Sequence, residues 1–144
     1  MSDDKVKVVQ RIWDIYTLGL EQGNTGALAT PYDEGLVAVD STVSPVSDIP
    51  GVKSEYVGPD GFAEFTRSWI QDWEGLTMRL VEAVDIGDDR VLAIVRQSAT
   101  GKLSGAAVEL DFGIVYTLEQ GLVVDRKDYK LDDARKAAGL SPPR

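Results

Sequence analysis

The second half of the chain reads as four consecutive β-strands joined by short polar turns, and this feature constrains the fold most. Apolar runs typical of strands cover Leu76–Ile86, Val91–Thr100, Ala106–Leu118 and Leu122–Lys130. These runs are interrupted by residue pairs with the composition of hairpin turns, at Asp88-Asp89, Gly101-Lys102 and Gln120-Gly121. We therefore expect a meander of long antiparallel strands.

Charged residues within these strands are the second informative feature. The ones that we single out are Arg96, Asp111, Arg126 and Asp128. A charge is unfavourable in a sheet that must bury one of its faces. A small domain keeps such a group inside only where it is paired or functional, so these positions are candidates for a site.

The first half of the chain is predicted to be mainly helical. Apolar residues recur at three- and four-residue spacing, as on one face of a helix, at Val6, Val9, Trp13, Tyr16 and Leu20. Gly23-Asn24 should end this helix, and Thr25 can cap a short helix over Ala27–Thr30. A short apolar strand, Leu36–Val39, then ends at Asp40.

Proline and glycine mark the boundaries that follow. We expect an irregular loop over Ser41–Val57, which contains Pro45, Pro50 and Gly51. A third helix should start at Pro59-Asp60-Gly61, with Asp60 as its N-cap. Its inner face is predicted to consist of Phe62, Phe65, Trp69 and Trp73.

The C-terminal end is predicted to hold one more short helix. Asp132-Asp133 opens it, Gly139 closes it, and Ser141–Arg144 is a tail. No repeat or linker is visible, so residues 1–144 form a single domain with its core over about 5–140.

Helices followed by a meander of long strands predict an α+β fold. Long strands twist and coil, so we expect a curved, mainly antiparallel sheet wrapped around the helices. Such a sheet makes a cone with one open end, and this is a natural pocket for a small apolar molecule.

Composition excludes several classes of function. The net charge of −9 argues against a nucleic acid or an anionic membrane as partner. The chain has no histidine and no cysteine, which excludes Ser-His-Asp and Cys-His catalysis and leaves Asp, Glu, Tyr or Lys for acid–base work. Carboxylates can still hold Mg²⁺ or Ca²⁺, but no calcium-loop motif is present, and we predict neither a metal nor a cofactor. Without a signal peptide or a membrane-spanning run, a cytoplasmic protein is expected.

Short segments along residues 5–140 resemble the nuclear transport factor 2-like superfamily, in particular its SnoaL-like and ketosteroid-isomerase-like members. The resemblance is carried by Gly23–Leu28, Tyr56–Phe62 with Phe65, Ile86–Asp89, Gly101–Gly105, Thr117–Gly121 and Asp128-Tyr129. It implies an NTF2-like, cystatin-like roll. The function is left open, since this fold hosts isomerases, cyclases, hydrolases and non-catalytic binders.

Two members of the superfamily imply site residues. The stretch from Val8 to Asp40 resembles ketosteroid isomerase, which implies that Asp40 is the carboxylate that moves a proton. Tyr16 and Asp111 lie beside the positions of that family's oxyanion hole. Gly113–Leu118 and Arg126–Tyr129 resemble limonene-1,2-epoxide hydrolase. That likeness matches Arg96 and Asp128 to two of its water-activating residues, with Ser98 at the position of a third. Both likenesses imply that Asp40, Arg96, Ser98 and Asp128 point into the cone.

Each candidate also has a structural interpretation. Asp40 can be the base or can cap a turn, and Arg96 can stabilise negative charge or lie at a sheet edge. Asp128 can orient Arg96 and polarise water, or can belong to a solvated ion pair. Asp111 fits a polar outer face equally well.

Aromatic residues supply the expected walls of the pocket. Core packing is the primary interpretation of Tyr16, Phe65 and Trp69, and lining of a pocket is the secondary one. Tyr56 can anchor the loop before the third helix or donate its hydroxyl to a ligand.

We therefore predict a cofactor-independent enzyme that acts on a small apolar molecule, such as a steroid, terpenoid or polyketide, by isomerisation, cyclisation or addition of water. Asp40, Arg96 and Asp128 would be catalytic, and Tyr16, Tyr56, Phe65, Trp69, Ser98 and Asp111 would bind the substrate. The alternative is a non-catalytic binding or association domain. A homodimer through the outer face of the sheet is expected, with Val115 and Val123 in the contact.

Overall fold

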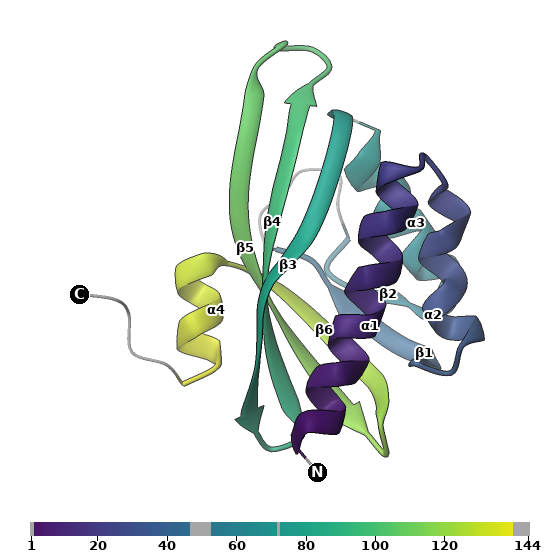
Figure 1. Cartoon of the computed structure of the whole chain (residues 1–144), viewed down its shortest axis with the longest axis vertical. Helices are drawn as coiled ribbons and strands as arrows, with labels where there is room; N and C mark the ends of the chain where they lie inside the picture. Colours follow the sequence, from purple (N-terminus) through teal and green to yellow (C-terminus); the bar gives the residue numbers. More distant parts are fainter. Residues whose placement is uncertain (1, 47–52, 72, 140–144) are drawn as a thin grey trace.

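A computed structural model describes residues 2–46, 53–71 and 73–139 (Figure 1). The helices are α1 (Ser2–Glu21), the 3₁₀-helix η1 (Thr25–Ala29), α2 (Thr30–Asp33), α3 (Gly58–Ile70) and α4 (Leu131–Ala137). The strands are β1 (Val37–Ser44), β2 (Tyr56–Val57), β3 (Trp73–Gly87), β4 (Arg90–Gly101), β5 (Ala107–Glu119) and β6 (Leu122–Lys130). The expected tail Ser141–Arg144 and the Pro50-Gly51 part of the expected loop lie outside the described residues.

The strands form one mixed sheet in the order β2-β1-β6-β5-β4-β3. Only the β1–β6 pair is parallel among the described pairings; the others are antiparallel. Asp88, Asp89 and Gln120 have positive φ, which is the backbone conformation of two-residue hairpin turns. The predicted meander and the α+β class are therefore confirmed.

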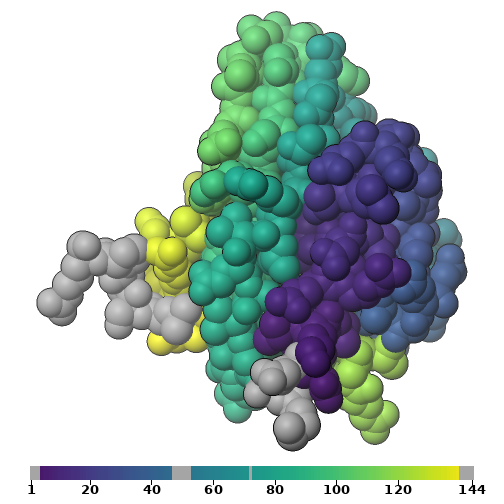
Figure 2. Space-filling view, viewed as in Figure 1, coloured from purple at the N-terminus to yellow at the C-terminus, as the bar shows by residue number. Residues whose placement is uncertain are grey.

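The two faces of the sheet are covered differently (Figure 1). Helices α1, η1, α2 and α3 pack on the concave face, and their apolar side chains join those of the sheet in the main core. Helix α4 packs on the opposite face, where Ala134 and Ala138 contact Leu92, Ile94 and Val115 in a second, smaller cluster. A space-filling view shows the β4–β5 hairpin rising above the helices (Figure 2).

Three boundaries differ from the sequence-based expectation. Strand β1 does not end at Asp40 but continues to Ser44, because it pairs with both β6 and β2. Trp73 begins β3 and does not belong to α3. The N-cap of α3 is Val57, so Asp60 stands within the first turn, where its charge faces the positive end of the helix dipole.

Gly113 lets α4 approach the sheet closely. A Cβ atom at this position would overlap the Cβ of Ala134. Replacing Gly113 by alanine should therefore lower the free energy of unfolding by about 1–3 kcal/mol, the usual effect of overpacking. Urea unfolding measures this, with Gly26→Ala at an exposed position of η1 as a control that leaves stability nearly unchanged. An unaltered Gly113→Ala protein would contradict the packing of α4 on β5.

No helix in the described part of the chain is both long and apolar enough to cross a membrane.

Candidate active site

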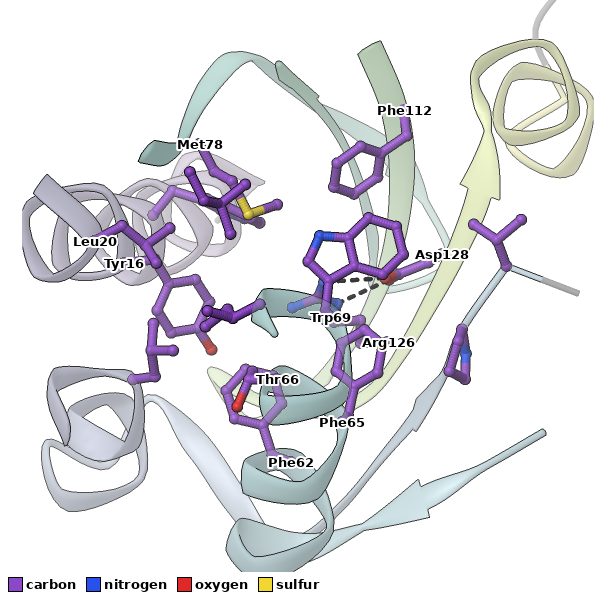
Figure 3. Close-up of a pocket in the computed structure, with 16 residues that line it drawn as sticks. Tyr16, Leu20, Phe62, Phe65, Thr66, Trp69, Met78, Phe112, Arg126 and Asp128 are labelled. Carbon is purple, nitrogen blue, oxygen red and sulfur yellow. Dashed lines mark hydrogen bonds and ion pairs between the residues drawn. The ribbon is translucent and has the colours of Figure 1, made fainter. Parts of the chain in front are cut away.

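A cavity opens between α1, α3 and the concave face of the sheet (Figure 3). Its lining is almost entirely apolar and aromatic, apart from one ion pair, and consists of Trp13, Tyr16, Leu20, Leu28, Pro45, Val46, Phe62, Phe65, Thr66, Trp69, Ile70, Leu76, Met78, Phe112, Arg126 and Asp128. The empty space between these side chains is about 590 Å³, part of which is open to solvent. The interior of this cavity is narrow.

Arg126 and Asp128 form the ion pair of this cavity. The Nε and Nη2 atoms of Arg126 donate to the two carboxylate oxygens of Asp128 at 2.8 and 3.0 Å. The side chains are only 7% and 6% exposed. Two parallel hydrogen bonds fix the orientation of both groups. No hydrogen bond from Nη1 of Arg126 to another described residue is present, so this nitrogen can donate to a bound molecule.

Aromatic rings surround the guanidinium group. The Cζ atom of Arg126 lies 5.8 Å from the ring centres of Trp13 and Phe62 and 5.6 Å from that of Phe65. Burial acts to lower the pKa of Arg126, but the attraction of Asp128 and the nearby Tyr116 and Tyr16 outweighs it and raises this pKa above its ordinary value. Arg126 therefore remains a cation inside the core.

The register of β6 explains why both charged side chains face inward. Arg126 pairs with Tyr116 and Asp128 pairs with Ile114, and these two partners on β5 belong to the main core. A shift of register between Thr117 and Leu118 gives Val123 the next core position. Residues two apart on a strand share a face, so the two charges lie side by side.

Two buried phenols complete the inner end of the site. Trp13 Nε1 donates to the hydroxyl of Tyr116 at 3.0 Å. Burial raises the pKa of Tyr16 well above its ordinary range, and it also raises the pKa of Tyr116. A second, smaller cavity is lined by Tyr16, Tyr116, Ser41 and Arg126 among others, so the guanidinium separates two hollows. The phenols thus stay protonated and can act as hydrogen-bond donors.

The structure brings together some of the residues expected from the sequence. Tyr16, Phe65, Trp69 and Asp128 line the cavity. Asp40, Arg96, Ser98, Asp111 and Tyr56 do not belong to its lining.

Asp40 is exposed on β1, and the expectation that it points into the cone is wrong. The pairing of β1 with β6 shifts register between Val37 and Thr42, and this irregularity turns Asp40 and its neighbour Val39, which is 74% exposed, out to solvent. Ser41 is buried in their place and lines the smaller cavity.

Arg96, Ser98 and Asp111 lie on the outer face of the sheet. This contradicts the expected placement of Arg96 and Ser98 in the cone and the substrate-binding role of Asp111, for which the outer-face interpretation holds. Arg96 donates through Nε and Nη2 to the carboxylate of Asp111 at 2.8 and 3.0 Å. The hydroxyl of Ser98 donates to the carboxylate of Glu109 at 3.5 Å. The hydrogen bond from Arg96 lowers the pKa of Asp111. The physical reason is the two-residue period of a strand. Val91, Ala93, Val95 and Ala99 face the core, so the even-numbered positions of β4 face outward.

The outer pair matches the inner one in geometry but not in environment. The Arg96–Asp111 side chains are 32% and 29% exposed, several times more than those of Arg126 and Asp128. The outer pair is thus a matched control for the inner pair.

Tyr56 anchors the segment before α3. Its buried hydroxyl accepts the backbone N–H of Lys53 at 3.1 Å, and its ring packs on Phe65. Of the two roles considered for Tyr56, the structural one agrees with these contacts.

The catalytic and substrate-binding residues expected from the sequence do not include two polar residues that face the cone, Arg126 and Gln97, although Arg126 was noted as a charged strand position. Arg126 was visible as a strand charge two residues from Asp128, and this spacing places both on one face. Gln97 is fully buried between the outward-facing Arg96 and Ser98. Its uncharged side chain gave no comparable signal. In the described ranges, no three acidic side chains gather closely enough to hold a metal ion.

Comparison with known proteins identifies the family. A family model described as the SnoaL-like domain matches residues 12–126, which is most of the chain. The chain belongs to the SnoaL-like domain family. No curated protein matches the sequence.

Solved structures of the same fold are distant in sequence. A proposed SnoaL-like polyketide cyclase from Jannaschia sp. CCS1 is 17% identical, with 98% of this chain and 94% of that chain covered and a TM-score of 0.69. TerC, co-crystallised with polyporic acid, is 15% identical, with coverage of 94% and 97% and a TM-score of 0.69. A ketosteroid isomerase-like protein from Catenulispora acidiphila DSM 44928, in complex with trimethylamine, is 15% identical, with coverage of 90% and 93% and a TM-score of 0.63. At these identities the likeness establishes the fold alone.

Proposed function

We propose that this SnoaL-like domain binds a small, flat, largely apolar molecule in its cone and catalyses proton transfer on it without a cofactor. The observation that carries this proposal is the Arg126–Asp128 pair, which is buried in a cavity otherwise lined by aromatic and aliphatic side chains. A buried ion pair contributes little to stability compared with apolar residues of the same volume. Its retention beside an open cavity therefore favours a role in recognition or chemistry.

The roles of the two residues follow from their charges. Asp128 is the candidate base, and it would take a proton from a carbon next to a carbonyl group. The electrons of the broken C–H bond would move to the carbonyl oxygen, where the free N–H groups of Arg126 would stabilise the negative charge. The hydroxyl of Tyr16 is a second donor for the same oxygen. Return of the proton from Asp128 to another carbon would complete an isomerisation. For a cyclisation, the carbanion would attack a second carbonyl carbon, and Asp128 would return its proton to the alkoxide oxygen that this attack forms.

The alternative function is non-catalytic binding of the same class of molecule. One observation favours it: both carboxylate oxygens of Asp128 already accept hydrogen bonds from Arg126, so a lone pair on each oxygen is occupied and is not available to take a proton. In this case the pair would only orient the ligand.

A thermal-shift screen followed by turnover measurements tests the proposal. Steroids, terpenoids and aromatic polyketides form the panel, because a ligand at 100 times its Kd stabilises the folded protein by about 2.7 kcal/mol. For a ligand that is converted, Asp128→Asn should lower kcat by about 10²–10⁴, as expected for a general base. Asp111→Asn on the outer face is the control and should leave kcat unchanged. A ligand that binds wild type and is never converted supports the binding function instead.

We also propose that two copies of the chain associate through the outer face of the sheet. Support comes from Val81, which is 48% exposed and stands where the register of β3 against β4 shifts, between Leu80 and Glu82. Val115 is covered by α4 and Val123 faces the core, so neither can form the contact expected from the sequence. Light scattering at micromolar concentration should give the mass of two chains, and Val81→Glu should reduce it to one. A wild-type monomer would overturn this proposal.

A further inference from the structure

Gln97 contains a buried hydrogen-bond donor that has no partner among the described residues. Its side chain is 1% exposed, and its carbonyl Oε1 accepts the indole N–H of Trp69 at 2.7 Å. An indole N–H can only donate, so this contact fixes which end of the amide is the NH₂ group. The Nε2 atom is enclosed and makes no hydrogen bond within the ranges that the structure describes.

In the described part of the chain, the residues opposite Gln97 on the two adjacent strands have no oxygen acceptor in their side chains. Its neighbours across the two adjacent strands are Met78 and Leu110, and Trp69 packs against Phe112 with ring centres 6.4 Å apart. Leaving a buried N–H without an acceptor is unfavourable, whereas an apolar residue of similar size would carry no such penalty. The position is next to the cavity, since Trp69, Met78 and Phe112 all line it.

Gln97 and the Arg126–Asp128 pair lie at different places along the cone. Asp128 pairs with Ile114, and Ile114 pairs with Ala93, so Gln97 stands four residues further along β4. At about 3.3 Å per residue, the backbone position of Gln97 is therefore about 13 Å along the strand direction from the position level with Asp128. A molecule that contacts both places is therefore elongated.

We propose that Gln97 determines specificity in this cavity: its Nε2 N–H donates a hydrogen bond to a second acceptor oxygen of the ligand, at the end remote from Arg126. This inference rests on the proposed function, and it narrows the ligand to elongated, flat molecules with a carbonyl or similar oxygen at each end. Trp69 covers the amide in the unliganded protein, so its indole moves aside when such a ligand binds. Gln97 is thus a binding residue, while the proton transfer remains with Asp128 and Arg126.

A matched pair of probes tests this inference. The molecule 4,4′-diacetylbiphenyl has a ketone at each end, and 4-acetyl-4′-ethylbiphenyl has the same shape with one ketone replaced by a methylene group. Wild type should bind the diketone about tenfold more tightly in isothermal titration, the preference that one well-formed hydrogen bond gives. Gln97→Met, which keeps the length of the side chain and removes the donor, should bind both probes equally. Gln10→Met on the exposed face of α1 is the control and should keep the preference.

The outcomes separate this inference from the proposed function. Equal binding of the two probes by wild type would overturn the role of Gln97 and leave the cavity with its ion pair in place. Failure of wild type to bind either probe would overturn both proposals for this ligand class. Because the first comparison uses wild type alone, the inference stays testable even if Gln97→Met does not fold.

Discussion

Asp128→Asn should lower the free energy of unfolding by about 3–5 kcal/mol, because it leaves the Arg126 guanidinium charged and unpaired within the core. Arg126 cannot escape this penalty by losing its proton near neutral pH, because a guanidinium group stays protonated in proteins. Urea unfolding followed by circular dichroism measures the loss. Asp111→Asn removes the same negative charge and one of the two acceptor oxygens in the outer pair. It should have a much smaller effect, because water solvates Arg96 there.

Replacing both inner partners should behave differently. Arg126→Met combined with Asp128→Leu removes the two charges together, so stability should match or exceed that of wild type, as found when buried ion pairs are replaced by apolar residues. A double variant as unstable as Asp128→Asn would show that the pair itself holds the fold together. That result would remove the argument that the ion pair is retained for function.

Stability should fall steeply above about pH 10. Phenols of the unfolded chain lose their protons near pH 10, whereas burial keeps Tyr16 and Tyr116 protonated and raises the pKa of Tyr32 to about 12. The unfolded state then binds fewer protons than the folded state, so the free energy of unfolding decreases with rising pH. Each fully buried phenol contributes a slope of about 1.4 kcal/mol per pH unit in this window.

Unfolding curves at pH 9, 10 and 11 check this expectation. Tyr16→Phe keeps the ring and removes the ionisable hydroxyl. The free energy of unfolding should therefore fall less steeply with pH, by about 1.4 kcal/mol per pH unit, the contribution of one phenol. Equal stability of wild type at the three pH values would mean that the phenols reach solvent, in conflict with the enclosed inner end of the cavity.

Local periodicity was sufficient to predict the architecture. Each long strand of the meander has an apolar run and a turn with the right chemistry at its end, so β4 and β6 are found within a residue of their predicted bounds. The aromatic wall was predictable for the same reason, since Tyr16, Phe65 and Trp69 stand at helical spacing.

The polar part of the site was harder to predict, because it depends on which face of a strand points inward. A change of one residue reverses the face, and this accounts for Arg96 and Ser98 in place of Gln97. At Asp40 the cause is an irregular stretch of β1, which no local pattern announces. Asp128 was placed correctly, but Arg126 and not Arg96 is its partner, since the pairing is set by their positions two residues apart on β6.

Ligand titration of two double variants tests the central claim most directly. The first ligand found in the thermal-shift screen is titrated into wild type, into Arg126→Met/Asp128→Leu and into Arg96→Met/Asp111→Leu, each shown to be folded. We expect the inner variant to bind about 10- to 100-fold more weakly, the loss of a hydrogen bond to a charged group, and the outer variant to bind like wild type. Unchanged affinity of the folded inner variant would contradict the assignment of Arg126 and Asp128 as the functional centre of the cone.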